Sequence, residues 1–532
     1  MAVTSLLPVV LLPLLGLSTT EDACAPYLQE PNMVFVGSLI FAIAVECSNL
    51  HKRIALWILQ RVGTKFDVLM LGFMLITMFI AMWIINTAAA AMMLPIADAV
   101  IEEVFPKPRR ESTFPDIKVV SADYNETLYS FAKGFKLNGN WDYNFVIKYF
   151  NCRLKYKFSK DKLQDIMMME TSKISEVPFT NPNVSVKKLK KLLYLSIAYS
   201  ANIGGTSTLT SNGPNLVLRF VVEMKYGGKT PVDYTNWLMF AAPPAIISVL
   251  LCWLLFKFLF LRNVCLPKES IGAKNVIEAK YKELGKVSFH EKAILVLFIL
   301  LVTLWMFRDP QFVKGWATYF GDTKPKDASV VIFIVILLFI LPSNPFGPYP
   351  SPALVNWPMV QTRLAWGVIL LRGGGFAIAN ATQTSGLSEF MGDVFARLNF
   401  MPFSAILVIF AVMSAFLTEF ASNSATATII LPVAAQLATN LEVNPLMILV
   451  PVTLSCSYAF VLPVGTPANA LVFEHAKLMP SDMLLPGLIT KLICLCVMFA
   501  TLYTLGFPIF SLGVFPDWVT SETNHHTTHH TG

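Results

Sequence analysis

Residues 85–95 read INTAAAAMMLP, and residues 422–432 read SNSATATIILP. In each stretch an Asn is followed by a hydroxyl residue, and a Pro lies eight residues beyond that hydroxyl. Each stretch follows a long apolar run, and the apolar sequence resumes after the Asn. A polar break inside such a run predicts a re-entrant hairpin, in which two half-helices meet at a polar tip. We therefore expect two hairpins with Asn86 and Asn423 at their tips.

A second polar break follows each hairpin. Residues 203–217 read IGGTSTLTSNGPNLV and residues 462–472 read LPVGTPANALV, so Gly, Thr, Pro and Asn interrupt both apolar stretches. Asn86 and Asn215 are 129 residues apart, whereas the corresponding Asn residues of the second half are 46 apart. The difference is close to the 85 residues of a basic loop in the first half. The matched breaks indicate an internal duplication, which is typical of transporters built from inverted repeats.

The composition of the chain is that of a membrane protein. Its 532 residues are 55% apolar and only 14% charged, with a mean hydropathy of +0.58, whereas soluble proteins are about 25% charged. We expect an all-α polytopic membrane protein with roughly ten to twelve membrane-embedded helical pieces. The sequence contains no GxSxG, HExxH or Walker motif, so neither an enzyme nor an ATP-driven pump is expected. The clearest apolar runs are Asp67–Ile85, Trp237–Leu261, Ala293–Phe307, Ala328–Leu341, Pro402–Leu417 and Leu485–Tyr503.

The loop between the two breaks of the first half indicates the orientation of the chain. Residues 106–190 hold 16 Lys and Arg against 9 Asp and Glu, and basic clusters lie at both ends of the loop, beside predicted spans. The positive-inside rule places these ends in the cytoplasm, so the sequons at Asn125 and Asn183 should be unmodified. A third sequon, at Asn380, lies too near a span to be interpreted. A basic surplus spread so evenly does not favour a nucleic-acid partner.

We expect one membrane transporter domain over residues 1–532. Its predicted parts are the start of the first repeat at 1–105 with a hairpin near 67–104, a cytoplasmic basic loop at 106–190, a broken helix and the following span at 191–262, a cytoplasmic connector at 263–292, the second repeat at 293–515 with a hairpin near 402–440 and a broken helix near 448–478, and a polar tail at 516–532.

The polar breaks have the chemistry of an anion site. Helices that begin at Asn86 and Asn423 would direct free N–H groups and positive dipole ends toward an anion. Asn amides and Ser or Thr hydroxyls donate hydrogen bonds to carboxylate or sulfate oxygens. Unwound carbonyls at Gly204-Gly205 and at Gly465 could coordinate a hard cation such as sodium. Polar residues in membrane helices often only link helices, but four breaks in duplicated register favour a binding site.

These segments resemble the divalent anion/sodium symporter family, which includes solute carrier family 13. The family contains di- and tricarboxylate carriers and sulfate carriers. In detail the chain is most similar to the animal sodium-coupled citrate and dicarboxylate branch, including the insect "I'm not dead yet" carriers. The resemblance is carried by ECSNLHKRI at 46–54, the first hairpin, IGGTSTLTSNGPNLVL at 203–218, WGVILLRGGGFAIANATQTSGL at 366–387, TEFASNSATATIILP at 418–432 and LPVGTPANALVF at 462–473.

The resemblance implies a homodimer in the plasma membrane that works by an elevator mechanism. Sodium ions would be the coupling ions, and no organic cofactor is implied. By resemblance, the substrate lies on Asn86, Thr87, Asn423 and Ser424, with Thr466 and Pro467 closing one side. One sodium ion would be bound by Asn86, Gly204 and Gly205, and the other by Thr418, Ala421, Asn423 and Gly465.

The chain departs from the family pattern at four places. Ile85 stands where the first motif normally has Ser, which removes a hydroxyl beside a predicted sodium site. Ser424 replaces Thr and keeps the hydroxyl. Arg372 stands where an apolar residue is usual, and a charge there is costly unless it faces water or a partner. Residues 2–17 resemble a segment that in the family follows an additional membrane helix, so we expect a shortened isoform or an incomplete gene rather than a signal peptide, which would carry basic residues before its apolar run.

The leading interpretation is a secondary active carrier of di- or tricarboxylates such as succinate and citrate. Three alternatives remain open. The same fold could carry sulfate or another divalent anion, or it could exchange anions without sodium. The chain could also be a transport-dead isoform that modulates full-length carriers. The reasons for this alternative are Ile85, Arg372 and the unusual start of the sequence.

Overall fold

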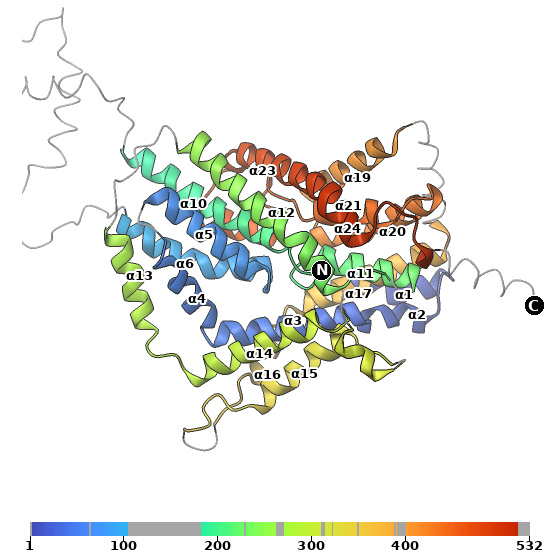
Figure 1. The fold of residues 1–532 in the computed structure, drawn as a ribbon, viewed down its shortest axis with the longest axis horizontal. Coiled ribbons are helices and arrows are strands. Elements are labelled where there is room, and N and C mark those ends of the chain that lie inside the picture. Colours follow the sequence, from blue (N-terminus) through green and yellow to red (C-terminus); the bar gives the residue numbers. More distant parts are fainter. Residues whose placement is uncertain are drawn as a thin grey trace, which may run out of the picture. The chain divides into compact units, whose positions relative to one another are not determined.

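The described part of the chain consists of helices joined by turns (Figure 1). The structure is a computed structural model that describes residues 3–62, 65–104, 182–227, 230–261, 271–309, 314–321, 323–347, 351–387, 390 and 401–519. Most of the basic loop, the Asn125 sequon and the end of the polar tail lie outside these residues, and so does the side chain of Asn183. The helices discussed below belong to the unit formed by Met1–Phe105 and Val186–Gly532.

The helices of the first half are η1 (Thr4–Leu6), α1 (Leu7–Leu14), α2 (Thr20–Cys24), η2 (Ala25–Leu28), α3 (Glu30–Cys47), α4 (Leu50–Leu59), α5 (Phe66–Ala81), α6 (Asn86–Val104), α10 (Pro182–Gly204), α11 (Gly213–Tyr226), α12 (Tyr234–Leu255), η3 (Phe256–Phe260) and α13 (Ile271–Glu283). Those of the second half are α14 (Phe289–Met306), η4 (Trp316–Phe320), α15 (Asp327–Ile340), α16 (Trp357–Arg363), α17 (Trp366–Thr384), α19 (Phe403–Leu417), α20 (Asn423–Asn440), α21 (Leu446–Ser455), α22 (Pro467–His475), α23 (Pro480–Thr501), η5 (Leu502–Gly506) and α24 (Phe507–Phe510).

The two Asn motifs each begin a helix that packs on the helix before it. After α5 the chain turns, and α6 begins at Asn86 and packs on α5 (Figure 1). After α19 the chain turns again, and α20 begins at Asn423 and packs on α19. The side chain of Ser422 caps α20 by accepting a 3.2 Å hydrogen bond from the N–H of Ala425. An oxygen at this position satisfies a helix N–H that has no partner in the helix itself.

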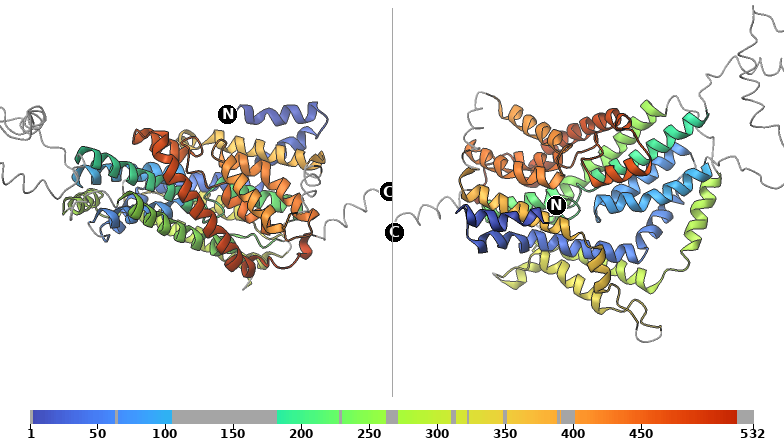
Figure 2. Two further views of the ribbon diagram at one scale, coloured as in Figure 1. Left: turned by 90° about the horizontal axis from the view of Figure 1, so that it is seen from above. Right: turned by 180° about the vertical axis from the view of Figure 1, so that it is seen from behind.

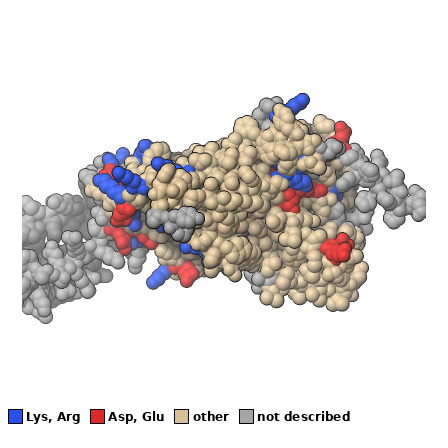
Figure 3. Space-filling model, turned by 90° about the horizontal axis from the view of Figure 1, so that it is seen from below, with Lys and Arg blue, Asp and Glu red and all other residues tan. Residues whose placement is uncertain are grey.

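The apolar helices are long enough for a polytopic membrane protein. By length and composition, four described segments could cross a membrane, namely Thr20–Cys47, Tyr234–Phe260, Phe289–Met306 and Pro480–Phe510. A fifth is possible if α16 and α17, which are bent by 65° at their junction, form one span. Shorter apolar helices include α5, α19 and α21, the first pieces of the two hairpins and of the second broken helix. Charged side chains gather toward the two ends of the view in Figure 3, and the surface between them is largely uncharged.

Residues of α3 and α4 hold the helices around them in place. α3 packs along α15 (Figure 2), and a Cβ added at Gly37 would lie 2.7 Å from the methyl carbons of Val331, so only Gly allows this approach. Arg53 of α4 pairs with Glu291 of α14 at 2.8 Å and donates to the carbonyl oxygen of Gly285 at 3.0 Å. These contacts fix α4, which leads into the first hairpin, to the beginning of α14.

A buried ion-pair cluster joins α11 to α3 and α15. Arg219 of α11 is 5% exposed, and it pairs with Asp327 at the start of α15 and with Glu30 at the start of α3, 3.5 Å away. Arg308, which follows α14, approaches the other carboxylate oxygen of Asp327 at 2.8 Å. Burial of Asp233, close to Arg308 and Asp327, raises the pKa of its carboxyl. Separation of α11 from α3 would therefore have to break a buried charge contact.

Candidate anion and sodium sites

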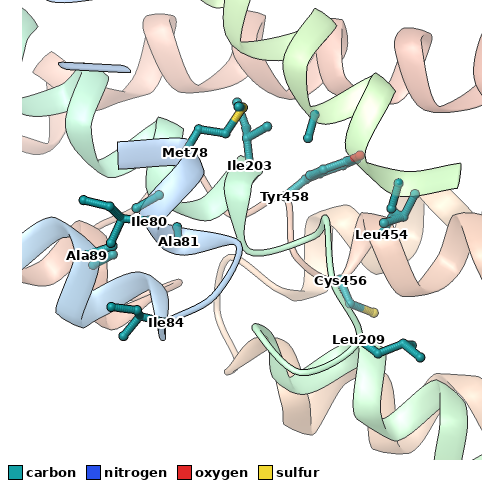
Figure 4. Packing of buried hydrophobic residues seen from close by; sticks show 14 of the residues in the cluster. Met78, Ile80, Ala81, Ile84, Ala89, Ile203, Leu209, Leu454, Cys456 and Tyr458 are labelled. Atoms are coloured by element: carbon teal, nitrogen blue, oxygen red, sulfur yellow. The ribbon is translucent and has the colours of Figure 1, made fainter. Parts of the chain in front are cut away.

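Asn86 packs against the Gly204-Gly205 turn at the end of α10. A Cβ added at Gly205 would lie 2.0 Å from Oδ1 of Asn86, and one at Gly204 would lie 2.3 Å from the carbonyl oxygen of Met78. The two glycines are therefore required for the first hairpin to approach the turn. Apolar side chains surround it, with Met78 of α5 beside Ile203 of α10 (Figure 4). The Oδ1 atom of Asn86 is buried and has no hydrogen-bond partner among the described residues.

The loop between α10 and α11, residues 205–212, is held by its own polar groups. Ser211 Oγ donates to the carbonyl oxygen of Gly205 at 2.6 Å, and Asn215 Nδ2 donates to that of Thr208 at 2.7 Å. Thr208 Oγ1 donates to the carbonyl oxygen of Met82, in the turn of the first hairpin, at 2.6 Å. These bonds satisfy buried backbone groups that would otherwise destabilise an unwound segment inside a membrane protein.

In the second half, Thr418, Asn423 and Gly465 lie together. Thr418 Oγ1 lies 2.8 Å from Oδ1 of Asn423 and 2.6 Å from the carbonyl oxygen of Cys456, either of which can accept its single proton. A Cβ added at Gly465 would lie 3.3 Å from the carbonyl oxygen of Thr418. Carbonyl, amide and hydroxyl oxygens are thus concentrated at the tip of the second hairpin.

A buried carboxylate organises the second loop, residues 456–466 between α21 and α22. Glu419 is 3% exposed and accepts backbone N–H groups from Phe460 at 3.0 Å and from Leu462 at 2.9 Å, and Val461 donates to both of its oxygens. Lys491 of α23 pairs with the same carboxylate at 2.6 Å. The pair lets the interior accept a charge that would be costly alone.

The two hairpin tips contact opposite ends of the loop 205–212. Asn86 contacts its beginning at Gly205, whereas Ser424 contacts the residue that follows its end, because a Cβ added at Gly213 would lie 1.8 Å from Ser424 Oγ. Asn202 of α10 connects the first tip with the second broken helix. Its Oδ1 accepts from Asn86 Nδ2 at 3.4 Å, and its Nδ2 lies 3.2 Å from Oγ1 of Thr466.

Comparison with known proteins identifies the family. The model of the sodium:sulfate symporter transmembrane region matches residues 1–512. The chain belongs to the sodium:sulfate symporter family. It is 36% identical to a mouse Na(+)/citrate cotransporter over 98% of this chain and 90% of that protein. It is 38% identical to rat solute carrier family 13 member 2 over 98% of this chain and 88% of that protein.

Two further comparisons extend this result. A Caenorhabditis elegans sodium-dependent low-affinity dicarboxylate transporter 1 is 36% identical over 98% of this chain and 86% of that protein. A crystal structure of the Alcanivorax borkumensis YdaH transporter has the same fold, with a TM-score of 0.51 and 12% identity over 91% of this chain and 86% of that chain. The predicted resemblance and the all-α polytopic transporter fold are confirmed, and the chain is an integral membrane protein.

The structure brings some of the predicted site residues of this family member together and leaves others apart. Asn86, Gly204 and Gly205 lie together, as do Thr418, Asn423 and Gly465, and Thr466 is connected to Asn86 through Asn202. Thr87 is half-buried at the start of α6, Ala421 is exposed in the tip before α20, and Pro467 is exposed at the start of α22. These last three residues lie at or just before the starts of α6, α20 and α22, and their roles stay predictions.

Three buried polar residues were missed by the sequence interpretation, namely Asn202, Glu419 and Lys491. Lys491 lies within the apolar run 485–503, and an ionisable residue inside a membrane span is a sign of a partner or a function. Glu419 directly follows Thr418, inside the segment that carries the resemblance. Asn202 follows YSA near the end of a mainly apolar stretch, and no sequence signal distinguishes it from an ordinary interhelical Asn.

Proposed function

We propose that the protein is a sodium-coupled secondary transporter of di- or tricarboxylates such as succinate and citrate in the plasma membrane. One observation carries the proposal: two helix starts, each at an Asn, contact the two ends of one unwound loop, and the Oδ1 of Asn86 is buried there without a hydrogen-bond partner among the described residues. The names of two relatives, a Na(+)/citrate cotransporter and a sodium-dependent low-affinity dicarboxylate transporter, support the choice of substrate.

The substrate carboxylates would be bound by hydrogen-bond donors and helix ends. Helices α6 and α20 begin at Asn86 and Asn423, and the first N–H groups of a helix carry a partial positive charge that stabilises an anion. The side chains of the binding set donate from amides and hydroxyls, and Pro467 would shape one wall. The proposed set is Asn86, Thr87, Asn423, Ser424, Thr466 and Pro467.

The sodium ions would be bound by oxygen atoms that lie beside the substrate. The first ion would use Oδ1 of Asn86 and carbonyl oxygens of Gly204 and Gly205. The second would use the cluster of oxygens around Thr418, with Ala421, Asn423 and Gly465 contributing. Oxygen ligands suit a hard cation. Two bound cations would offset the charge of the carboxylates, which explains how a site without Arg or Lys could hold them.

We further propose an elevator mechanism in a homodimer. The two hairpins and the two broken helices would move together, because α11 packs on α20 and α21, and α6 packs on α22. They would move against a scaffold that includes α3, α14 and α15. The division of the chain into repeats, loop and connector given above is part of this proposal.

Uptake of labelled succinate and citrate by cells that express the chain tests the function. Saturable uptake is expected in sodium medium, with a loss when choline replaces sodium. Combined Asn86→Ala and Asn423→Ala substitutions should reduce it to background at unchanged surface expression. The control is Asn444→Ala, since Asn444 is equally buried but its amide bonds the carbonyl oxygens of Ser511 and Val514 away from the site. Background uptake by the unaltered chain would reject the proposal.

Sodium-independent exchange is the second candidate, because Ile85 places an apolar, half-buried side chain beside the first sodium site. Uptake that persists in choline and is accelerated by unlabelled substrate on the opposite side would establish it. Competition between sulfate and succinate distinguishes the two anion classes in the same assay.

A further inference from the structure

The amide of Asn202 is the meeting point of both halves of the site. Asn202 lies in the last turn of α10 and is fully buried. Its Oδ1 accepts a hydrogen bond from Asn86 Nδ2 at 3.4 Å. Its Nδ2 lies 3.0 Å from Oδ1 of Asn469, 3.2 Å from Oγ1 of Thr466 and 3.3 Å from the carbonyl oxygen of Ala459. Every atom of the amide that can form a hydrogen bond therefore has a partner.

The first consequence is the orientation of Asn86. An Asn amide can be turned over, which exchanges its oxygen and its nitrogen, and its hydrogen bonds decide between the two orientations. Oδ1 of Asn202 requires a donor, so Nδ2 of Asn86 faces Asn202. Oδ1 of Asn86 then faces Gly205, where it is buried and has no hydrogen-bond partner among the described residues. Only this orientation directs an oxygen, the atom that a sodium ion binds, toward the glycine turn.

The second consequence is a connection between the repeats. Thr466 caps α22, because its Oγ1 accepts the N–H of Asn469 at 3.3 Å. The Nδ2 of Asn469 donates to the carbonyl oxygens of Ala459 at 2.9 Å and Leu462 at 3.3 Å, so it fixes the unwound loop. The amide of Asn202 thus joins the first hairpin to the loop and helix start of the second repeat.

We propose that Asn202 is a positioning residue that orients the Asn86 amide for the first sodium ion and transmits binding of that ion to Thr466. The inference rests on the proposed sodium-coupled transport. It predicts that sodium affinity and the effect of sodium on substrate affinity depend on different atoms of the same amide. The acceptor Oδ1 serves the sodium site, and the donor Nδ2 serves the connection to the second repeat.

Two substitutions separate these roles. Asn202→Leu removes both roles. The sodium concentration that gives half-maximal thermal stabilisation should then rise about tenfold, which corresponds to the loss of one buried hydrogen bond. Asn202→Asp keeps an acceptor for Asn86 but cannot donate to Thr466 or Asn469. It should therefore retain sodium binding, while saturating sodium no longer lowers the succinate KM.

Two measurements test the proposal. The first is thermal stabilisation of the purified protein by sodium without substrate, and the second is the succinate KM at low and high sodium. Asn444→Leu is the matched control, since it also removes a buried amide and should lower stability without moving the sodium midpoint. An unchanged sodium midpoint in Asn202→Leu, or an Asn202→Asp variant with the normal dependence of KM on sodium, would overturn the inference. If the unaltered protein shows neither sodium-dependent stabilisation nor sodium-dependent uptake, the proposed function fails, and the inference fails with it.

Discussion

The substitution Glu419→Gln should destabilise the second half of the site strongly. It leaves Lys491, which is 8% exposed, without its 2.6 Å carboxylate partner and with the carbonyl oxygen of Ala415 as its remaining acceptor at 2.5 Å. Breaking a buried ion pair by neutralising one partner costs about 3–5 kcal/mol. Glu419 accepts loop N–H groups with both carboxylate oxygens, and Gln keeps only one acceptor oxygen. The loss should therefore come from the isolated charge and from the loop N–H groups that lose their acceptor.

A second substitution tests how much of the loss in stability comes from the isolated charge of Lys491. In Glu419→Gln combined with Lys491→Met no charge of this pair is left buried, and the double variant should recover the part of the free energy of unfolding that was lost to the isolated charge. The control is Asp482→Asn, which breaks the Lys191–Asp482 pair. That pair has the same 2.6 Å separation, but its side chains are 28% and 23% exposed. Solvent screens such a pair, so its loss should cost less than about 1 kcal/mol.

The assay is unfolding of the purified protein in mixed micelles, with the sodium midpoint for stabilisation measured in parallel. Glu419→Gln should lower the free energy of unfolding and also raise the sodium midpoint, because Gly465 belongs to the loop that the carboxylate holds and Thr418 contacts the first residue of that loop, Cys456. The reasoning is refuted if Glu419→Gln costs no more than Asp482→Asn. It is also refuted if the effects of the two substitutions in the double variant simply add.

Three further outcomes are expected. Ile85→Ser should lower the sodium midpoint for uptake severalfold by restoring a hydroxyl beside Asn86, and a sodium titration of uptake checks this. Arg372→Met should leave stability unchanged or raise it by about 1–4 kcal/mol. The guanidinium has no hydrogen-bond partner among the described residues, and it lies 4.1 Å from the ring centre of Phe35 and 5.7 Å from that of Phe376; thermal unfolding measures the change. Glu30→Gln should weaken the contact of α3 with Arg219, and in the proposed elevator it should change the maximal uptake rate more than the substrate KM, which initial-rate kinetics measure.

The hairpins could be predicted because their signals are local. An Asn after an apolar run, with a hydroxyl next to it and a Pro one helix segment later, determines where a helix must end and begin. The helices indeed begin at Asn86 and Asn423. The duplication indicates which polar breaks correspond, and it therefore predicts that both Gly-containing turns belong to the site.

The polar network behind these motifs could not be predicted in the same way. The partners of Glu419 are backbone N–H groups of a loop and a lysine on another helix, and neither distance nor burial is visible along the chain. The environment of Arg372 was also open. The sequence indicates only that a charge there is costly unless it faces water or a partner, whereas the structure buries the side chain among aromatic rings of α3 and α17. At both Glu419 and Arg372 the sequence shows an unusual charged residue in an apolar segment, but only the tertiary structure shows which groups surround it.

The two halves of the site are held by different physical means, and this difference bears on sodium coupling. In the second half, an ionised pair fixes the loop, and a carboxylate oxygen of Glu419 would lie 3.3 Å from a Cβ at Gly465. In the first half, neutral hydrogen bonds and a close Gly205 contact orient a single amide. The backbone oxygen of Ile85 already accepts the N–H of Ala89 at 3.1 Å. With no hydroxyl at position 85, sodium binding at the proposed first site would depend on how rigidly Asn86 is held, so in this proposal the amide of Asn202 should affect the sodium affinity.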